Sequence, residues 1–168
     1  LNVTALWKQE ARRPRRGAPL PAVEPSFKEA WARFSIHAQA RRRLVALGVG
    51  TMAFGMADIL LEPYGGQVLG LTVGSTTKLT AALALGTLVG FAWASRILSR
   101  GFDPLRMAGL GAIIGVPGFL AVIGAAPLDS PSLFVSGTVL IGFGAGLFGH
   151  GTLTATMQLA PREQVGLA

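Results

Sequence analysis

The apolar stretch LVALGVGTMAFGMADILL, residues 44–61, decides how the rest of the chain is interpreted. Its only ionisable side chain is that of Asp58. As a helix it would rise about 1.5 Å per residue and cover roughly 27 Å, close to the hydrocarbon thickness of a bilayer. We therefore predict a membrane span over residues 44–62.

This span runs directly into the sequence EPYGG, residues 62–66. Pro63 removes a backbone donor and the two glycines after Tyr64 favour a loop, so we expect the helix to end here and a loop to reach Thr77. Asp58 and Glu62 are four residues apart, which places both carboxylates on one face of a helix.

Ionisable groups in a membrane span are costly and are functional candidates by default. Asp58 and Glu62 are therefore candidate intramembrane acids, suited to a proton relay, a cation site or the polar edge of a ligand. Lys78, at the start of the next span, is a candidate counter-ion. The alternative is structural: Glu62 is hydrated at the interface and Asp58 is hydrogen-bonded to a neighbouring helix.

The composition agrees with a membrane protein. Of the 168 residues, 51% are hydrophobic, 14% are charged and 23 are Gly, which is too apolar for an ordinary soluble domain. With no cysteine, the chain has no disulfide and no Cys-ligated metal. The net charge of +7 is unevenly spread and lacks the aromatic interleaving of a nucleic-acid groove, so we expect no nucleic-acid partner. No set of nucleophile, His and acid predicts an enzyme, and no cluster predicts a metal site.

The remaining segments complete an all-α, polytopic membrane helix bundle with four spans. Residues 1–11 resemble the end of a preceding transmembrane helix. Residues 12–43 form a basic linker, in which Ser26-Phe27-Lys28-Glu29 matches a capping box that starts an amphipathic helix containing His37. The membrane domain, 44–168, has further spans over 79–98, 105–126 and 133–160. Both ends interrupt apolar patterns, so we expect a piece of a longer protein.

The basic residues predict the orientation of these spans. Of the 15 Lys and Arg residues, only Lys78 falls in the loops on the second side of the membrane. By the positive-inside rule the two chain ends and residues 96–106 face the cytoplasm. Asp58 then lies about one turn inside the outer interface.

Small residues four apart allow helix backbones to approach in lipid. The pairs Gly86 and Gly90, Gly111 and Gly115, and Gly142 and Gly146 are therefore predicted to pack helices together. His150 follows the last pair and is flanked by Gly149 and Gly151. These glycines leave room for a flat ligand over the helix face, and the imidazole is a candidate contact for it. The alternative is a histidine hydrogen-bonded across a helix contact.

Four stretches together resemble the PucC-type, bacteriochlorophyll-delivery family of the major facilitator superfamily. They are DILLEPYGG (58–66), VLGLTVG (68–74), RGFDPLR (100–106) and IGFGAGLF (141–148). The resemblance covers residues 44–160. It implies that the chain belongs to the C-terminal half of a twelve-span protein, whose central cytoplasmic loop would be the basic linker.

The resemblance also implies a function: assembly of light-harvesting complexes in the inner (cytoplasmic or intracytoplasmic) membrane of a bacterium, in contact with antenna polypeptides or bacteriochlorophyll. Under this resemblance the His150 imidazole is a candidate ligand for the magnesium of the pigment, with room for its flat macrocycle over the helix face. The alternative is a proton-coupled small-molecule transporter of the same superfamily. A gating motif of such transporters has the form Gly-x-x-x-Asp-Arg. Gly90 begins a similar stretch, but Ala94 stands where the Asp would be, which favours a role other than transport.

Overall fold

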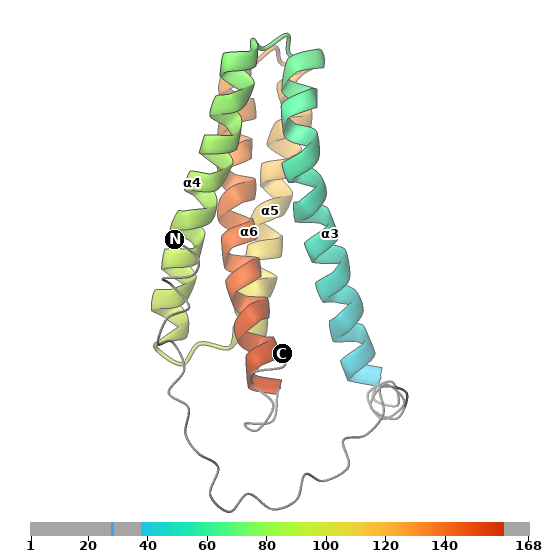
Figure 1. Ribbon diagram of the computed structural model, residues 1–168, viewed down its shortest axis with the longest axis vertical. Coiled ribbons are helices and arrows are strands. Elements are labelled where there is room, and N and C mark those ends of the chain that lie inside the picture. The colour runs from blue at the N-terminus through green and yellow to red at the C-terminus, as the bar shows by residue number, and fades with distance from the viewer. Residues whose placement is uncertain (1–27, 29–37, 160–168) are drawn as a thin grey trace, which may run out of the picture. The chain divides into compact units, whose positions relative to one another are not determined.

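The structure, a computed structural model, describes Lys28 and residues 38–159. Residues 42–168 belong to one compact unit. The helices are α3 (Ala38–Gln67), α4 (Val73–Leu98), α5 (Pro104–Ala125) and α6 (Pro131–Leu159) (Figure 1). Within the described residues there is no strand, and each of these four helices is long and apolar enough to cross a membrane. The prediction of an all-α bundle with four spans is confirmed.

Three predictions fall on parts of the chain outside the described residues. These are the end of a preceding helix before residue 12, most of the basic linker with its amphipathic helix, and the end of the last predicted span at residue 160. Lys28, the one described residue of this linker before residue 38, is helical and exposed.

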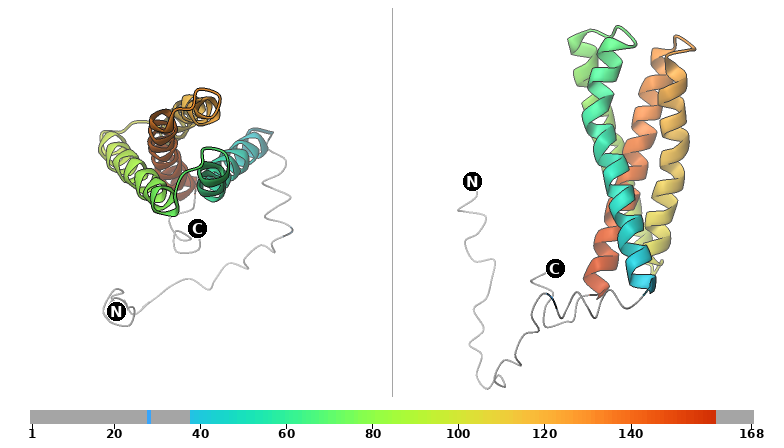
Figure 2. Two further views of the ribbon diagram at one scale, coloured as in Figure 1. Left: turned by 90° about the horizontal axis from the view of Figure 1, so that it is seen from above. Right: turned by 90° about the vertical axis from the view of Figure 1, so that its right-hand side faces the viewer.

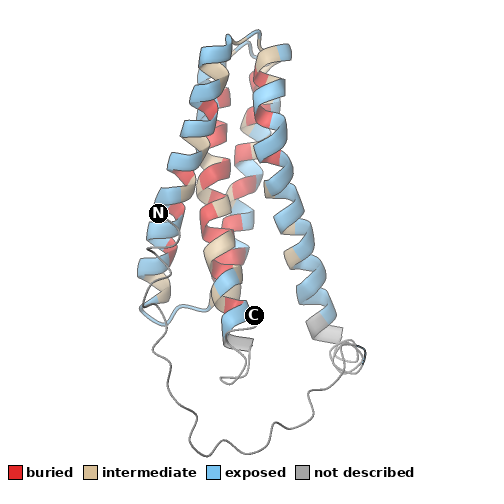
Figure 3. Ribbon diagram, in the orientation of Figure 1, coloured by how far each residue is buried: buried red, intermediate tan, exposed pale blue. Residues whose placement is uncertain are grey.

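Successive helices alternate in direction, so α4 and α6 are parallel to each other and antiparallel to α3 and α5 (Figure 1). Seen along the bundle, α6 lies between α4 and α5 (Figure 2). Burial is accordingly concentrated on α6 and on the sides of its neighbours, whereas the N-terminal half of α3 is almost wholly exposed (Figure 3).

The outward surfaces of the helices are apolar. Ile59 on α3, Val73 on α4 and Ile113 on α5 are 73%, 84% and 68% exposed. Large aliphatic side chains exposed on every side are incompatible with water but suit contact with lipid chains. The chain is therefore part of a multi-pass membrane protein.

The end of α3 differs from the prediction. Helix α3 passes through Pro63 and ends at Gln67, so the loop covers residues 68–72 only. The reason is tertiary packing: Gly65 is buried, and a Cβ there would lie 3.0 Å from Leu79 and 3.1 Å from Phe134. The glycine is thus used for a close helix contact rather than for a turn. The chain reverses later, at Gly70, where φ is +62°.

The opposite end of the bundle is organised by Asp103. Its Oδ1 accepts hydrogen bonds from the backbone N–H groups of Leu105 (2.7 Å) and Arg106 (3.1 Å). Asp103 therefore caps α5, and Pro104 occupies the first helical position, where no donor is needed. Gly101, with φ +86°, supplies the left-handed residue of the same turn.

Candidate functional site

The two predicted acids lie on the side of α3 that faces α4. Asp58 lines an open groove of about 560 Å³, in which α3 and α4 form the walls and α6 contributes Ile141 and Ala145. The other lining residues are Phe54, Gly55, Thr80, Leu83, Ala84, Thr87 and Leu88. Asp58 is exposed to this groove, and it is the only charged residue that lines it.

Glu62, one turn further along α3, accepts a hydrogen bond from the hydroxyl of Thr80 on α4. This differs from the structural alternative, in which Glu62 was hydrated and Asp58 was hydrogen-bonded to a neighbouring helix. In the structure Glu62 is the acid bound to a neighbouring helix, and Asp58 is exposed to the groove. Lys78 is exposed two residues before Thr80. The partner of Glu62 is therefore the hydroxyl of Thr80, and not the candidate counter-ion Lys78.

The sequence interpretation missed Thr80 and Thr87 as groove residues. They are seven residues apart in an apolar helix, and this spacing alone places them on one face. The hydroxyl of Thr87 donates to the backbone oxygen of Leu83 (2.9 Å), and that of Thr80 donates to Glu62. Since both protons are used internally, both oxygens can only accept from the groove. An ionised Asp58 adds two more acceptors, so the groove suits a partner that brings donors or a cation.

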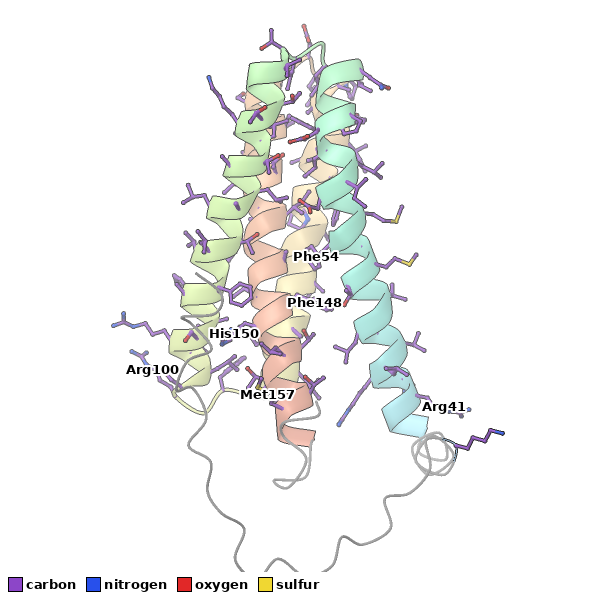
Figure 4. The ribbon with its side chains drawn as sticks, in the orientation of Figure 1. Arg41, Phe54, Arg100, Phe148, His150 and Met157 are labelled. Atoms are coloured by element: carbon purple, nitrogen blue, oxygen red, sulfur yellow. The ribbon has the colours of Figure 1, made fainter. Side chains whose placement is uncertain are left out.

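His150 lies on the other side of this region, at the contact between α6 and α4. Its ring meets that of Phe91 edge to face, with centroids 5.2 Å apart and an interplanar angle of 80°. Its Nδ1 is buried and, within the described residues, has no hydrogen-bond partner. The ring is half-buried, so only Nε2 is available to a ligand. Figure 4 shows His150 between these two helices, away from Phe54 on α3.

The predicted room for a macrocycle beside His150 is wrong. The Cβ position of Gly146 is filled by the backbone of Thr87 and Phe91, and that of Gly149 faces the Phe91 ring at 3.8 Å. A Cβ at Gly151 would meet the backbone of α5, with Pro104 O and Ala108 N both 2.7 Å away. These glycines are sites of helix contact, so the space they leave is occupied by α4 and α5.

The six glycines proposed for helix packing lie at helix contacts. Gly86 and Gly90 on α4 face the backbone of α6, and Gly142 and Gly146 on α6 face the backbone of α4. On α5, a Cβ at Gly111 would lie 2.5 Å from Gly144 O and from Phe148 N, while one at Gly115 would meet the Phe54 ring at 2.9 Å. A second set at helix contacts has members seven residues apart rather than four. These are Gly111 and Gly118 on α5, and Gly137, Gly144 and Gly151 on α6. Of this set, only Gly111 was among the predicted pairs.

Comparison with known proteins now adds to this geometry. The family described as PUCC protein matches residues 1–168, the whole chain. The chain belongs to the PucC family. It is 60% identical over 169 residues to Protein PucC of Rhodovulum sulfidophilum, covering 99% of this chain and 37% of that protein. It is 56% identical over 168 residues to Protein PucC of Cereibacter sphaeroides, covering 100% and 36%.

A more distant PucC relative carries a different name. The Bacteriochlorophyll synthase 44.5 kDa chain of Rhodobacter capsulatus is 28% identical over 171 residues, covering 95% of this chain and 37% of that protein. The chain therefore spans a little over one third of the length of these relatives. No solved structure matches it at a significant level.

Proposed function

We propose that the protein is a non-enzymatic membrane factor for the assembly of light-harvesting complexes, and that it handles bacteriochlorophyll or antenna polypeptides. The observation that supports this most is the family match over residues 1–168. The name of the Rhodobacter capsulatus relative connects a homologous chain with bacteriochlorophyll. An apolar, multi-pass chain is also suited to contact a lipid-soluble pigment or a membrane polypeptide, because both lie in the bilayer.

Within this function, the groove between α3 and α4 is the contact for the cargo. It offers apolar walls, which suit a hydrocarbon-soluble ligand, and one exposed carboxylate at Asp58. Oxygen donors are the preferred ligands of magnesium, and they also accept hydrogen bonds from a polypeptide. Asp58 therefore fits the pigment better than His150 does, because Asp58 is exposed to the groove whereas His150 is half-buried against Phe91.

The test is to purify the full-length protein from a phototrophic bacterium and to measure the bacteriochlorophyll and antenna polypeptides that it retains. We expect Asp58→Asn to lose most of both. Asp129→Asn is the matched control, since Asp129 is exposed in the turn before α6, outside the groove, and its positive φ of 44° is tolerated by Asn. Equal cargo in the wild type and in Asp58→Asn would overturn the proposed site.

His150→Leu separates the two candidate pigment contacts. Leu fills a similar volume and keeps an apolar contact with Phe91, so the bundle should be preserved. We expect pigment content to remain at the wild-type level. Loss of pigment in His150→Leu, together with retention in Asp58→Asn, would place the ligand at His150 instead.

Proton-coupled transport is the second candidate function, and the exposure of Asp58 in a membrane groove favours it. Ala94 counts against it: this residue is fully buried with Met107 and Leu147, where the Asp of a gating motif would be surrounded by apolar groups. Transport predicts a pH-dependent uptake that Asp58→Asn abolishes. Uptake unchanged by that substitution would exclude coupling through Asp58.

We further propose that the end of the bundle with the basic residues faces the cytoplasm, in the inner membrane. Arg42, Arg43, Arg100 and Arg106 are exposed at this end. Because the chain has no cysteine, single cysteines report the topology without background. Ser99→Cys should be blocked by a membrane-impermeant thiol reagent only in inverted vesicles, and Ser130→Cys only in right-side-out cells. The reverse pattern would invert the topology.

A further inference from the structure

A second groove lies on the surface of α4, away from Asp58. It has a volume of about 510 Å³ and is lined by Val89, Ala92, Trp93, Arg96, Ile97 and Arg100. Val89, Trp93, Arg96 and Arg100 follow one another at steps of four, three and four residues, so they form one stripe along the helix. The stripe is apolar within the span and carries two guanidinium groups where the helix ends.

The floor of this groove is held by packing. The indole of Trp93 meets the Phe143 ring edge to face, with centroids 6.4 Å apart and an interplanar angle of 81°. Ile97 packs against the buried cluster of Ala94, Met107 and Leu147. Trp93 and Ile97 are therefore held in place by their contacts with neighbouring side chains.

The charges at its end are both positive. Arg96 and Arg100 are one turn apart and exposed, and Figure 4 shows Arg100 directed outward from the end of α4. Asp103, the described acid nearest to Arg100 in the sequence, has its Oδ1 bound to two backbone N–H groups of α5. Two guanidinium groups with this spacing offer donor pairs to one phosphate, which guanidinium binds with two parallel hydrogen bonds.

We propose that this groove binds one anionic phospholipid of the leaflet at this end of the bundle. The phosphate lies between Arg96 and Arg100, Trp93 lies at the level of the glycerol, and an acyl chain follows Val89 and Ala92. The complementarity of charge selects an anionic head group, and the apolar continuation of the stripe requires a lipid tail. Basic sites at membrane interfaces bind anionic head groups in this way, at about a five-fold gain in affinity for each Lys or Arg.

The experiment uses Trp93 as its own reporter. In the chain with Trp7→Phe and Trp31→Phe, Trp93 is the only one of the three tryptophans that remains. The chain is reconstituted in bilayers containing lipid brominated in its acyl chains, which quenches an adjacent indole. We expect brominated phosphatidylglycerol to quench Trp93 at a lower mole fraction than brominated phosphatidylcholine does. Arg96→Gln and Arg100→Gln should each reduce this preference about five-fold.

The matched control is Arg106→Gln. Arg106 is exposed at the same end of the bundle but lies on α5, outside the groove. An equal loss in Arg106→Gln would show a general charge effect and overturn the site, as would quenching independent of the head group. Inorganic phosphate is the last arm: if it displaces the brominated lipid, the groove binds free phosphate instead of lipid. Circular dichroism with unchanged helix content ensures that each variant is folded.

Discussion

Helix α6 contacts α4 and α5 through its backbone, but it contacts α3 through aromatic side chains. Between α5 and α6, a Cβ at Gly144 would lie 2.7 Å from Gly111 O, so the two main chains touch directly. Between α3 and α6, the Phe54 and Phe148 rings are 5.5 Å apart and tilted by 44°. At the other end of α3, Tyr64 stacks on Phe134 with centroids 5.8 Å apart.

This difference separates a fixed part of the molecule from an adjustable part. Where glycines bring two backbones into contact, the main chains themselves set the separation of the helices, and no change of rotamer at that point can alter it. Aromatic contacts permit a helix to tilt with little loss of contact energy, since edge-to-face and offset ring geometries have similar energies. The groove that carries Asp58 lies between adjustable α3 and fixed α4 and α6. Its width can therefore change while its floor on α6 stays in place.

The largest effect is expected where a methyl group enters the fixed part. Gly111→Ala places a Cβ 2.5 Å from Gly144 O and Phe148 N, and we expect it to destabilise the bundle by about 1–3 kcal/mol. The control is Gly109→Ala, on the same helix, where a Cβ meets nothing within 4 Å. That substitution should stabilise the helix by up to about 1 kcal/mol. Reversible unfolding in mixed micelles measures both, and equal shifts would show that the main chains are not in contact.

The contrast also shows what the sequence could and could not reveal. The four spans could be predicted because any helix that crosses a lipid bilayer needs an apolar stretch long enough to span it. Glycines four apart were predicted to lie at contacts, while Gly118, Gly137, Gly144 and Gly151 were missed because seven-residue spacing was not considered. Gly65 was assigned to a loop, because glycine favours both a turn and a close contact, and only the position of Leu79 and Phe134 decides between them.

Less of the candidate site than of the fold could be predicted from the sequence. Asp58 is an isolated charge in an apolar stretch. It could be identified without knowing which residues of other helices lie beside it. The pairing of Glu62 with Thr80 and the closure of the space beside His150 depend on which helix lies opposite. No local pattern encodes that choice, so the acids were identified while their partners were not.

An intermediate effect is expected in the adjustable part. Phe54 contacts Phe148 and, with centroids 6.3 Å apart, Phe119 on α5. Phe54→Ala removes both of these ring contacts. We expect α3 to move relative to the other helices while α4, α5 and α6 stay packed.

Spin labels at Met52→Cys on α3 and Leu153→Cys on α6 measure this movement, because the chain has no other cysteine. The distribution of distances between the labels should broaden in Phe54→Ala. Met56→Ala is the control, since Met56 lies two residues further along α3 and is 50% exposed. A narrow distribution in Phe54→Ala would mean that α3 is as fixed as the glycine-packed helices.

The smallest effect is expected at the hydrogen bond that joins α3 to α4. Thr80→Val keeps the shape of the side chain and removes the donor to Glu62. Hydrogen bonds between membrane helices average about 0.6 kcal/mol, so the change in stability should be of that order. Thr77→Val is the matched control, because the Thr77 hydroxyl donates within its own helix, to Val73 O at 3.0 Å. A double-mutant cycle with Glu62→Leu isolates the pair. A coupling free energy of zero would leave the aromatic rings as the contacts that hold α3, and would show that the Glu62 carboxylate adds nothing to the packing of α3 on α4.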